Sequence, residues 1–233
     1  MYADGFNPMD NLKTKMWLRL IFVFIIMGLL LFIPAGTIRY WQAWGYLAVY
    51  SGSTVLIILY LMKKDVALLN RRLRGGPTAE KEIKQKIIML FVSIGFISLL
   101  VVSALDHRFM WSSVPLYMLI AGYILTAIGW YIVFFVCKEN SFASATIEIA
   151  DNQKVISTGP YAIVRHPMYA GSLFYLIGMP LSLSSYWGLL VCAGMMPFLI
   201  WRLFDEERFL AKNLPGYTEY CAKVRWRMIP GIF

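Results

Sequence analysis

The sequence contains few charged residues. Only 15% of its 233 residues are Asp, Glu, Lys or Arg, whereas roughly a quarter are charged in ordinary soluble domains. Apolar residues make up 59% of the chain. This composition excludes a soluble enzyme. It also excludes an intrinsically disordered chain, because disordered chains are poor in apolar residues.

Cysteine and histidine are also scarce. Cys137, Cys192 and Cys221 are isolated and form no Cys-x-x-Cys pair, and His107 and His166 lie far apart in the sequence. An odd number of isolated cysteines argues against a disulfide framework. The spacing offers no set of zinc ligands either, so the sequence predicts no metal site.

Long uncharged stretches dominate what is present. About 20 residues of helix cross a bilayer core, and five stretches approach or exceed this length: 20–38, 40–62, 87–105, 109–137 and 167–201. As one helix the last would be about 52 Å long, against a hydrocarbon core of about 30 Å. We expect it to turn at Ser182, Ser184 and Ser185 into a short hairpin, Met168–Leu183 and Tyr186–Phe204. The predicted fold is all-α and integral to the membrane, with about six transmembrane helices.

The positive residues predict the orientation of these helices. Of the 22 Lys and Arg residues, all except Arg39 and Arg108 fall in the two terminal segments and in the loops that six spans place on the same side. The positive-inside rule assigns that side to the cytoplasm. We therefore expect both termini in the cytoplasm, with the protein in the cell membrane of a bacterium or the endoplasmic reticulum of a eukaryote.

The net charge of +9 does not require a nucleic-acid partner. Anionic headgroups beside the cytoplasmic loops account for it, and no nucleic-acid-binding module is visible. Within 63–86, Val66, Leu68 and Leu69 stand among arginines, which is typical of a basic amphipathic segment on the membrane surface. We interpret 63–86 as a lipid-anchoring connector. The sequence leaves the oligomeric state open.

The predicted spans contain no ionisable residue near their centres. Asp106 and His107 lie at the end of a span. Because transporters usually keep titratable groups near the bilayer midplane, a secondary transporter is disfavoured.

The last third of the chain carries the chemical motifs. Gly159-Pro160 indicates a turn, and Pro167 disfavours helical geometry at His166, so a tight entry into the fifth span follows. Such an entry exposes backbone N–H groups at a helix N-terminus, where a carboxylate can bind. Arg202 and Glu206 are four residues apart and share one face of the last span. A cation, a carboxylate and an imidazole are thus expected to converge at the membrane surface.

These motifs resemble those of the isoprenylcysteine carboxyl methyltransferase family, within a wider group that includes membrane phospholipid methyltransferases. The elements occur in the family's order: Gly159-Pro160-Tyr161, then Arg165-His166-Pro167-Met168-Tyr169-Ala170-Gly171, the pair Glu206-Glu207, and Gly216-Tyr217 with Tyr220. The resemblance is strong over about 140–233. The spacing from the glutamate pair to Tyr217 is about one residue shorter than usual, so Glu206 and Glu207 both stay candidates for the same contact.

The resemblance implies S-adenosylmethionine as methyl donor, bound in a cytoplasmic site built from the C-terminal third. By position, the cofactor-binding residues are Gln153, Lys154, Val155, Ile156, Tyr161, His166, Pro167, Met168, Tyr169 and Glu206. Arg202 matches a position that approaches the acceptor, where a guanidinium suits a carboxylate. His166 and Glu207 are the local candidates to take a proton from an amine acceptor. No metal is implied. Residues 1–136 then form four transmembrane helices with the 63–86 loop, and 137–233 form the catalytic region.

Alternatives remain for each residue and for the function. His166 is alternatively a loop residue, Arg202 a side chain reaching the headgroups, the glutamate pair a solvated face, and the tyrosines interfacial anchors. Carboxyl O-methylation of a lipophilic, isoprenylcysteine-like acceptor is the leading hypothesis. The alternatives are phospholipid N-methylation, S-methylation of a small thiol, and a non-catalytic binding protein of the same fold. A membrane reductase is disfavoured because no dinucleotide-binding fingerprint is present.

Overall fold

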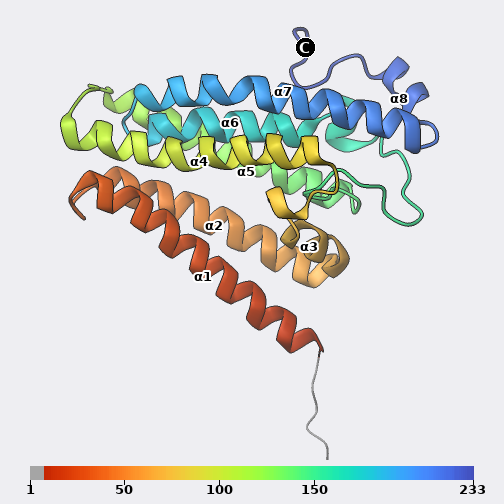
Figure 1. Ribbon diagram of the computed structural model, residues 1–233, viewed down its shortest axis with the longest axis horizontal. Coiled ribbons are helices and arrows are strands. Elements are labelled where there is room, and N and C mark those ends of the chain that lie inside the picture. The colour runs from red at the N-terminus through yellow and green to blue at the C-terminus, as the bar shows by residue number, and fades with distance from the viewer. Residues whose placement is uncertain (1–7) are drawn as a thin grey trace, which may run out of the picture.

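Six long helices run back and forth along the molecule (Figure 1). The computed structural model describes residues 8–233, and every regular element in that range is helical. The long helices are α1 (Pro8–Ala35), α2 (Trp41–Lys64), α4 (Ile83–Phe109), α5 (Leu116–Glu139), α6 (Pro167–Ser182) and α7 (Trp187–Asn213). The short elements are α3 (Val66–Leu73), η1 (Pro77–Ala79), η2 (Gly159–Ala162) and α8 (Tyr217–Lys223). The predicted all-α fold is confirmed.

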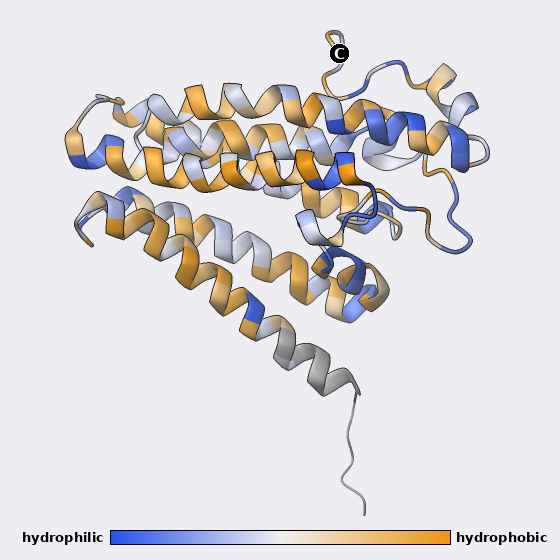
Figure 2. Cartoon of the chain, viewed as in Figure 1, coloured by the Kyte–Doolittle hydropathy of each residue, from blue (hydrophilic) through white to orange (hydrophobic). Residues whose placement is uncertain are grey.

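Five of the described helices, α1, α2, α4, α5 and α7, are long and apolar enough to cross a membrane. Figure 2 shows their hydrophobic character, with hydrophilic residues gathered toward the end that carries α3 and α8. The last uncharged stretch folds back as predicted, into α6 and α7. α6 has only 16 residues, and α7 continues past the predicted end at Phe204 to Asn213. The chain is therefore a multi-pass membrane protein.

Glycines allow α5 and α6 to pack with their backbones in contact. A β-carbon on Gly129 would lie 2.6 Å from the Tyr175 nitrogen, and one on Gly178 would lie 2.6 Å from the Thr126 nitrogen. Small residues of this kind let helices approach closely where water cannot drive their association. The contact places the short α6 inside the bundle and fixes the depth at which its first residue begins.

Three short turns, which join α1 to α2, α4 to α5 and α6 to α7, lie at one end of the bundle. At this end a buried carboxylate connects the helices. Asp106 in α4 accepts hydrogen bonds from the Ser112 backbone nitrogen and hydroxyl, both at 2.7 Å, and from the Ser185 hydroxyl. The Ser185 oxygen also accepts from the Gly188 nitrogen at 3.0 Å. A polar group buried at this depth requires such partners, and these join the α4 end to the α6–α7 turn.

The 63–86 segment packs against the rest of the protein. Asp65 caps α3 by accepting from the Leu68 nitrogen at 2.8 Å, as an N-terminal aspartate does. Gly76, with φ of +104°, adopts a backbone conformation that favours glycine, and it precedes Pro77 where the chain turns back toward the bundle. As a result Glu80 is 4% exposed. Leu68 and Leu69, which we expected on the membrane surface, are also buried inside the protein, so that placement was wrong.

Candidate active site

One pocket of about 350 Å³ lies at the end of the bundle opposite the three short turns. Helices α3 to α8, η2 and the loop 140–156 surround it. Its polar lining includes Arg72, Asn140, Ser144, Glu148, Gln153, Lys154, Tyr161, Arg165, His166, Tyr169, Arg202, Glu206 and Tyr217. Its apolar lining includes Met89, Val92, Phe96, Trp130, Val133, Leu176, Met195 and Leu199. The pocket thus joins a polar end to an apolar interior between the helices.

The motif residues meet in this pocket. Every residue proposed from the sequence to bind the cofactor lines it, and Arg202 lines it as well. Glu207 is absent from that lining although His166 is present. The structure therefore separates the two adjacent glutamates, because neighbouring residues on a helix point about 100° apart.

The entry into α6 places His166 at the pocket wall. Pro167 is the first residue of α6, a position that needs no backbone N–H. The backbone nitrogens of Arg165 and His166 donate to the carbonyl oxygens of Trp226 and Arg227, at 2.9 and 2.8 Å. The C-terminal tail therefore occupies these two N–H groups, and they are not open to a ligand carboxylate.

Glu207 is the centre of a cationic cluster behind His166. Its Oε1 lies 3.1 Å from Arg165 Nε and 3.3 Å from His166 Nε2, and its Oε2 lies 2.9 Å from Arg227 Nε. A carboxylate on a ring nitrogen holds the imidazole in one orientation. The alternative in which Glu207 belongs to an ordinary solvated face does not fit these contacts.

Glu206 has a different environment. It lines the pocket and accepts a hydrogen bond from the Tyr169 hydroxyl at 2.7 Å. No ion pair with a cationic side chain is found for Glu206 among the residues whose side chains are described. Its negative charge is therefore available to a cation in the pocket.

Tyrosines and an asparagine close the polar end. The Tyr161 hydroxyl accepts from Asn140 Nδ2 at 2.8 Å, and the Tyr220 hydroxyl donates to the Tyr161 carbonyl at 2.7 Å. Burial raises the pKa of the Tyr161 hydroxyl, and the charge of Glu206 raises it further, although the Asn140 hydrogen bond acts in the opposite direction. Tyr161 therefore stays protonated and neutral at physiological pH.

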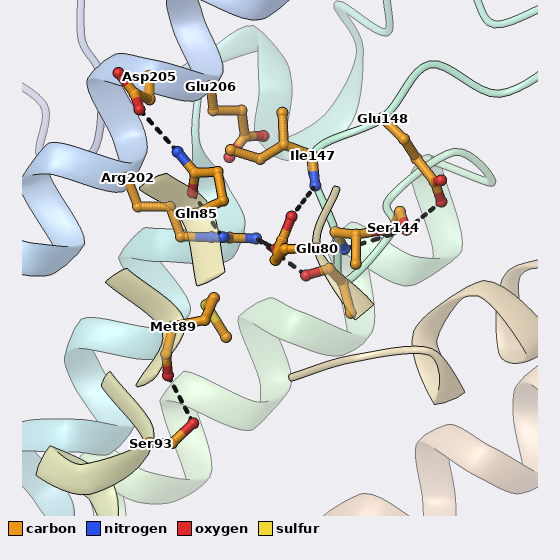
Figure 3. Close-up of polar contacts among 12 residues, drawn as sticks. Glu80, Gln85, Met89, Ser93, Ser144, Ile147, Glu148, Arg202, Asp205 and Glu206 are labelled. Carbon is orange, nitrogen blue, oxygen red and sulfur yellow. Dashed lines mark hydrogen bonds and ion pairs between the residues drawn. The ribbon is translucent and has the colours of Figure 1, made fainter. Parts of the chain in front are cut away.

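Arg202 is held inside the protein and does not reach toward headgroups. Figure 3 shows its guanidinium between Glu80 and Gln85. Nη2 bonds Glu80 Oε1 at 2.7 Å and the Ala145 carbonyl at 3.1 Å, and Nη1 bonds Gln85 Oε1 at 2.9 Å. With Arg202 only 7% exposed, the alternative of a headgroup-reaching side chain is wrong.

Sequence reasoning missed Glu80 and Gln85 as partners of Arg202. Gln85 also donates to Asp205 at 2.9 Å, so it joins α4 to α7 twice. Glu80 stands in a basic loop 122 residues from Arg202, and no local pattern marks such a pair.

Two buried polar atoms of the pocket lining have neither a hydrogen bond nor an ion pair within the described part of the chain. They are Trp130 Nε1 and the Tyr217 hydroxyl. An unpaired buried donor costs about 1–3 kcal/mol, so these atoms indicate where a ligand would be favoured. Residues 8–233 contain no group of three His, Cys, Asp or Glu side chains that suits a metal ion.

A family model described as phospholipid methyltransferase matches residues 117–215, somewhat less than half of the chain. The match covers α5, α6 and α7 together with the loop and motifs between them. It confirms the resemblance to the group of isoprenylcysteine carboxyl and phospholipid methyltransferases. No curated protein matches the chain. Arg72, Glu80 and Gln85 lie outside the matched residues.

We predict that Glu80→Ala destabilises the protein strongly. The substitution leaves the Arg202 guanidinium buried without its ion pair, which typically costs about 3–5 kcal/mol in the free energy of unfolding. Denaturant unfolding in detergent micelles measures this. Glu82→Ala is the matched control, because Glu82 is exposed and its substitution removes the same charge from the same segment. Equal stability of the two variants would show that the Arg202–Glu80 pair contributes nothing.

Proposed function

We propose that the chain is a membrane methyltransferase with S-adenosylmethionine as its methyl donor and a lipophilic molecule as its acceptor, and the match of residues 117–215 to the phospholipid methyltransferase family supports this. The observation that carries the proposal is the pocket itself. Its polar end gathers the motif residues and its other end is apolar and enclosed by helices. A water-soluble cofactor and a membrane-dissolved acceptor can therefore meet in one place.

The residues of the polar end fit the proposed cofactor. It carries a sulfonium and an ammonium cation, and Glu206 offers an unpaired carboxylate. Tyr217 offers a buried hydroxyl without a partner in the described chain. Binding is assigned to Gln153–Ile156, Tyr161, His166–Tyr169 and Glu206. When bound, S-adenosylmethionine supplies an electrophilic methyl group, whose bond to sulfur breaks as the bond to the acceptor forms.

The protein's own contribution is orientation and exclusion of water. Holding two reactants in line at near-attack distance accounts for many orders of magnitude in rate. In a water-poor pocket, the attraction between an anionic nucleophile and a cationic donor is stronger than in water. Residues such as Met195 and Leu199 keep the inner part of the pocket dry. In this proposal the reaction needs neither a metal nor a covalent protein intermediate.

The acceptor determines whether the protein must also remove a proton. A carboxylate acceptor loses none, whereas an amine does, and His166 is then the base. Glu207 Oε1, 3.3 Å from His166 Nε2, stabilises the imidazolium that forms. Carboxyl O-methylation of an isoprenylcysteine-like acceptor is our first proposal. Phospholipid N-methylation is the second candidate, which the description of the matching family favours.

Arg202 has a narrower role in this proposal than a free carboxylate clamp. Its charge is balanced by Glu80 at 2.7 Å, so an acceptor carboxylate would have to compete with that partner. Arg202 therefore shapes the pocket and offers hydrogen-bond donors without adding net charge to it.

We expect purified protein with radiolabelled S-adenosylmethionine to methylate a lipophilic acceptor. The acceptors to compare are a prenylcysteine, an aminophospholipid and a small thiol, in the same micelles. Label transfer to the prenylcysteine alone supports O-methylation, and transfer to the phospholipid alone supports N-methylation. Transfer to the thiol alone would contradict a lipophilic acceptor. If the protein binds neither the cofactor nor an acceptor, the methyltransferase proposal fails.

We predict that Glu206→Gln weakens binding of S-adenosylhomocysteine, measured by calorimetry. Loss of a charged hydrogen-bonding group reduces affinity by about 10- to 100-fold. Glu219→Gln, at an exposed position of α8, is the matched control and keeps wild-type affinity. Glu207→Gln is expected to bind normally if it acts only through His166. If Glu207→Gln loses affinity and Glu206→Gln does not, the assignment of the two glutamates is reversed.

We also propose that the pocket end of the bundle faces the cytoplasm, on the strength of the 20 to 2 division of positive residues. Both termini then lie in the cytoplasm. Cys221 is first changed to Ser. A single cysteine is then introduced either at Ile38, which is 74% exposed, or at Lys154. Membrane-impermeant maleimide added to intact bacterial cells should label position 38 and spare position 154. The opposite pattern would invert the proposed orientation.

A further inference from the structure

The charged groups of the pocket fall into two classes. Arg202 is paired with Glu80, and Arg165 is paired with Glu207. Four other charged residues of the lining, Arg72, Glu148, Lys154 and Glu206, have no ion pair among the residues whose side chains are described. Lys154 is exposed, and Glu148 accepts a hydrogen bond from the Ser144 hydroxyl at 3.0 Å. Arg72 and Glu206 are half-buried, and a charge removed from water is costly unless it is paired, so these two are the groups that a ligand's charges would match best.

Arg72 comes from α3, and its guanidinium lines the pocket from the side of the 63–86 segment. Its polar contacts are weak. Nη1 lies 3.4 Å from the Ala143 carbonyl and 3.8 Å from the Met168 sulfur. An arginine can donate five hydrogen bonds in a planar fork that matches a carboxylate or phosphate. Most of this donor capacity is unused in the described structure.

A second donor in the same part of the pocket is also without a partner. Trp130 Nε1 is buried and has no acceptor in the described chain. The Trp130 ring stacks on Tyr175 with centroids 5.7 Å apart, and Tyr175 lines the same pocket. Trp130 and Arg72 both line the pocket together with Met168. An indole N–H can only donate, so the ligand atom that it suits is an acceptor.

Resting on the proposed function, we infer that Arg72, with Trp130 as a second donor, binds an oxyanion of one substrate. The ligand class is a carboxylate or a phosphate monoester or diester. The oxyanion belongs either to the acceptor or to the carboxylate end of the cofactor. Glu206 then receives the cationic part of the ligands and Arg72 the anionic part. This assigns a binding role to a residue outside the region that matches the family.

The ion pairs of the pocket favour binding of an oxyanion at Arg72 over binding at Arg202. An oxyanion at Arg202 has to displace or face Glu80, whose carboxylate already lies 2.7 Å from the guanidinium. An oxyanion at Arg72 meets no carboxylate bonded to the same guanidinium. Because like charges in a dry pocket repel strongly, the same ligand group is bound more favourably at Arg72.

Calorimetric titration with hexyl phosphate, and with hexanol as the neutral analogue, tests the inference in micelles of an uncharged detergent. Hexyl phosphate should bind the wild type more tightly than hexanol does. Arg72→Gln should lower its affinity by about tenfold or more, because a charged hydrogen-bond partner is lost. Arg74→Gln, which removes an exposed charge from the same segment, should leave affinity unchanged. Equal loss in both variants, or no loss in either, would overturn the inference.

A second variant keeps the test valid if Arg72→Gln fails to fold. Trp130→Phe retains the ring and removes only the N–H group, so hexyl phosphate should bind about twofold to tenfold more weakly while hexanol binds as before. Thermal unfolding identifies variants that remain folded. Unchanged hexyl phosphate affinity in a folded Trp130→Phe would remove Trp130 from the site. If the wild type binds hexyl phosphate no more tightly than hexanol, the proposed oxyanion site does not exist.

Titration with S-adenosylhomocysteine distinguishes the two sources of the oxyanion. If Arg72→Gln lowers its affinity as much as that of hexyl phosphate, Arg72 binds the cofactor's carboxylate. If S-adenosylhomocysteine binds normally and the apparent KM for the lipophilic acceptor rises, Arg72 binds the acceptor. Hexyl phosphate binding needs no methyl transfer. If the protein binds hexyl phosphate through Arg72 but does not bind S-adenosylhomocysteine, the anion site is supported and the methyltransferase proposal is contradicted.

Discussion

The close contact between α5 and α6 determines where the pocket can lie. Because Gly129 and Gly178 leave no room for a β-carbon between the two backbones, α6 is fixed in depth and rotation against α5. Its first residue, Pro167, then lines the same pocket as Glu206 of α7. The tight approach of two helices thus brings His166 and Glu206 to one pocket, although the two residues belong to different helices.

The pair formed by Glu80 and Arg202 extends this arrangement to the first half of the chain. The region that matches the family contains Arg202 but not its counter-charge. A guanidinium buried beside apolar residues needs that carboxylate, so the 63–86 segment has to fold over the pocket and not along the lipid surface. The pocket is therefore complete only when both halves of the chain contribute. The division into 1–136 and 137–233 separates the sequence motifs from the rest of the chain, but the walls of the pocket come from both parts.

Features set by local chemistry could be predicted from the sequence, and those set by distant contacts could not. The uncharged stretches, the turn near Ser184 and the entry at Pro167 depend on neighbouring residues, and the structure contains all three. Because Glu206 and Glu207 are adjacent on a helix, the sequence showed that they point in different directions. It did not show which of the two faces the pocket. Glu80 was invisible because its partner is far along the chain. The tail carbonyls at Trp226 and Arg227, which occupy the entry to α6, carry no pattern at all.

The same rule of paired charges connects the stability of the site with its selectivity. Within the described structure, Arg165 and Arg202 find their counter-charges in the protein, so their pairing stabilises the fold whether or not a ligand is bound. Glu206 and Arg72 find none, so in the proposed site the charged groups of the ligands supply their counter-charges. A neutral lipid, however well it fits the apolar wall, lacks these charges. Selection among lipophilic acceptors in such a pocket therefore depends on the charged head of the molecule, while the apolar wall sets the strength of binding for all of them alike.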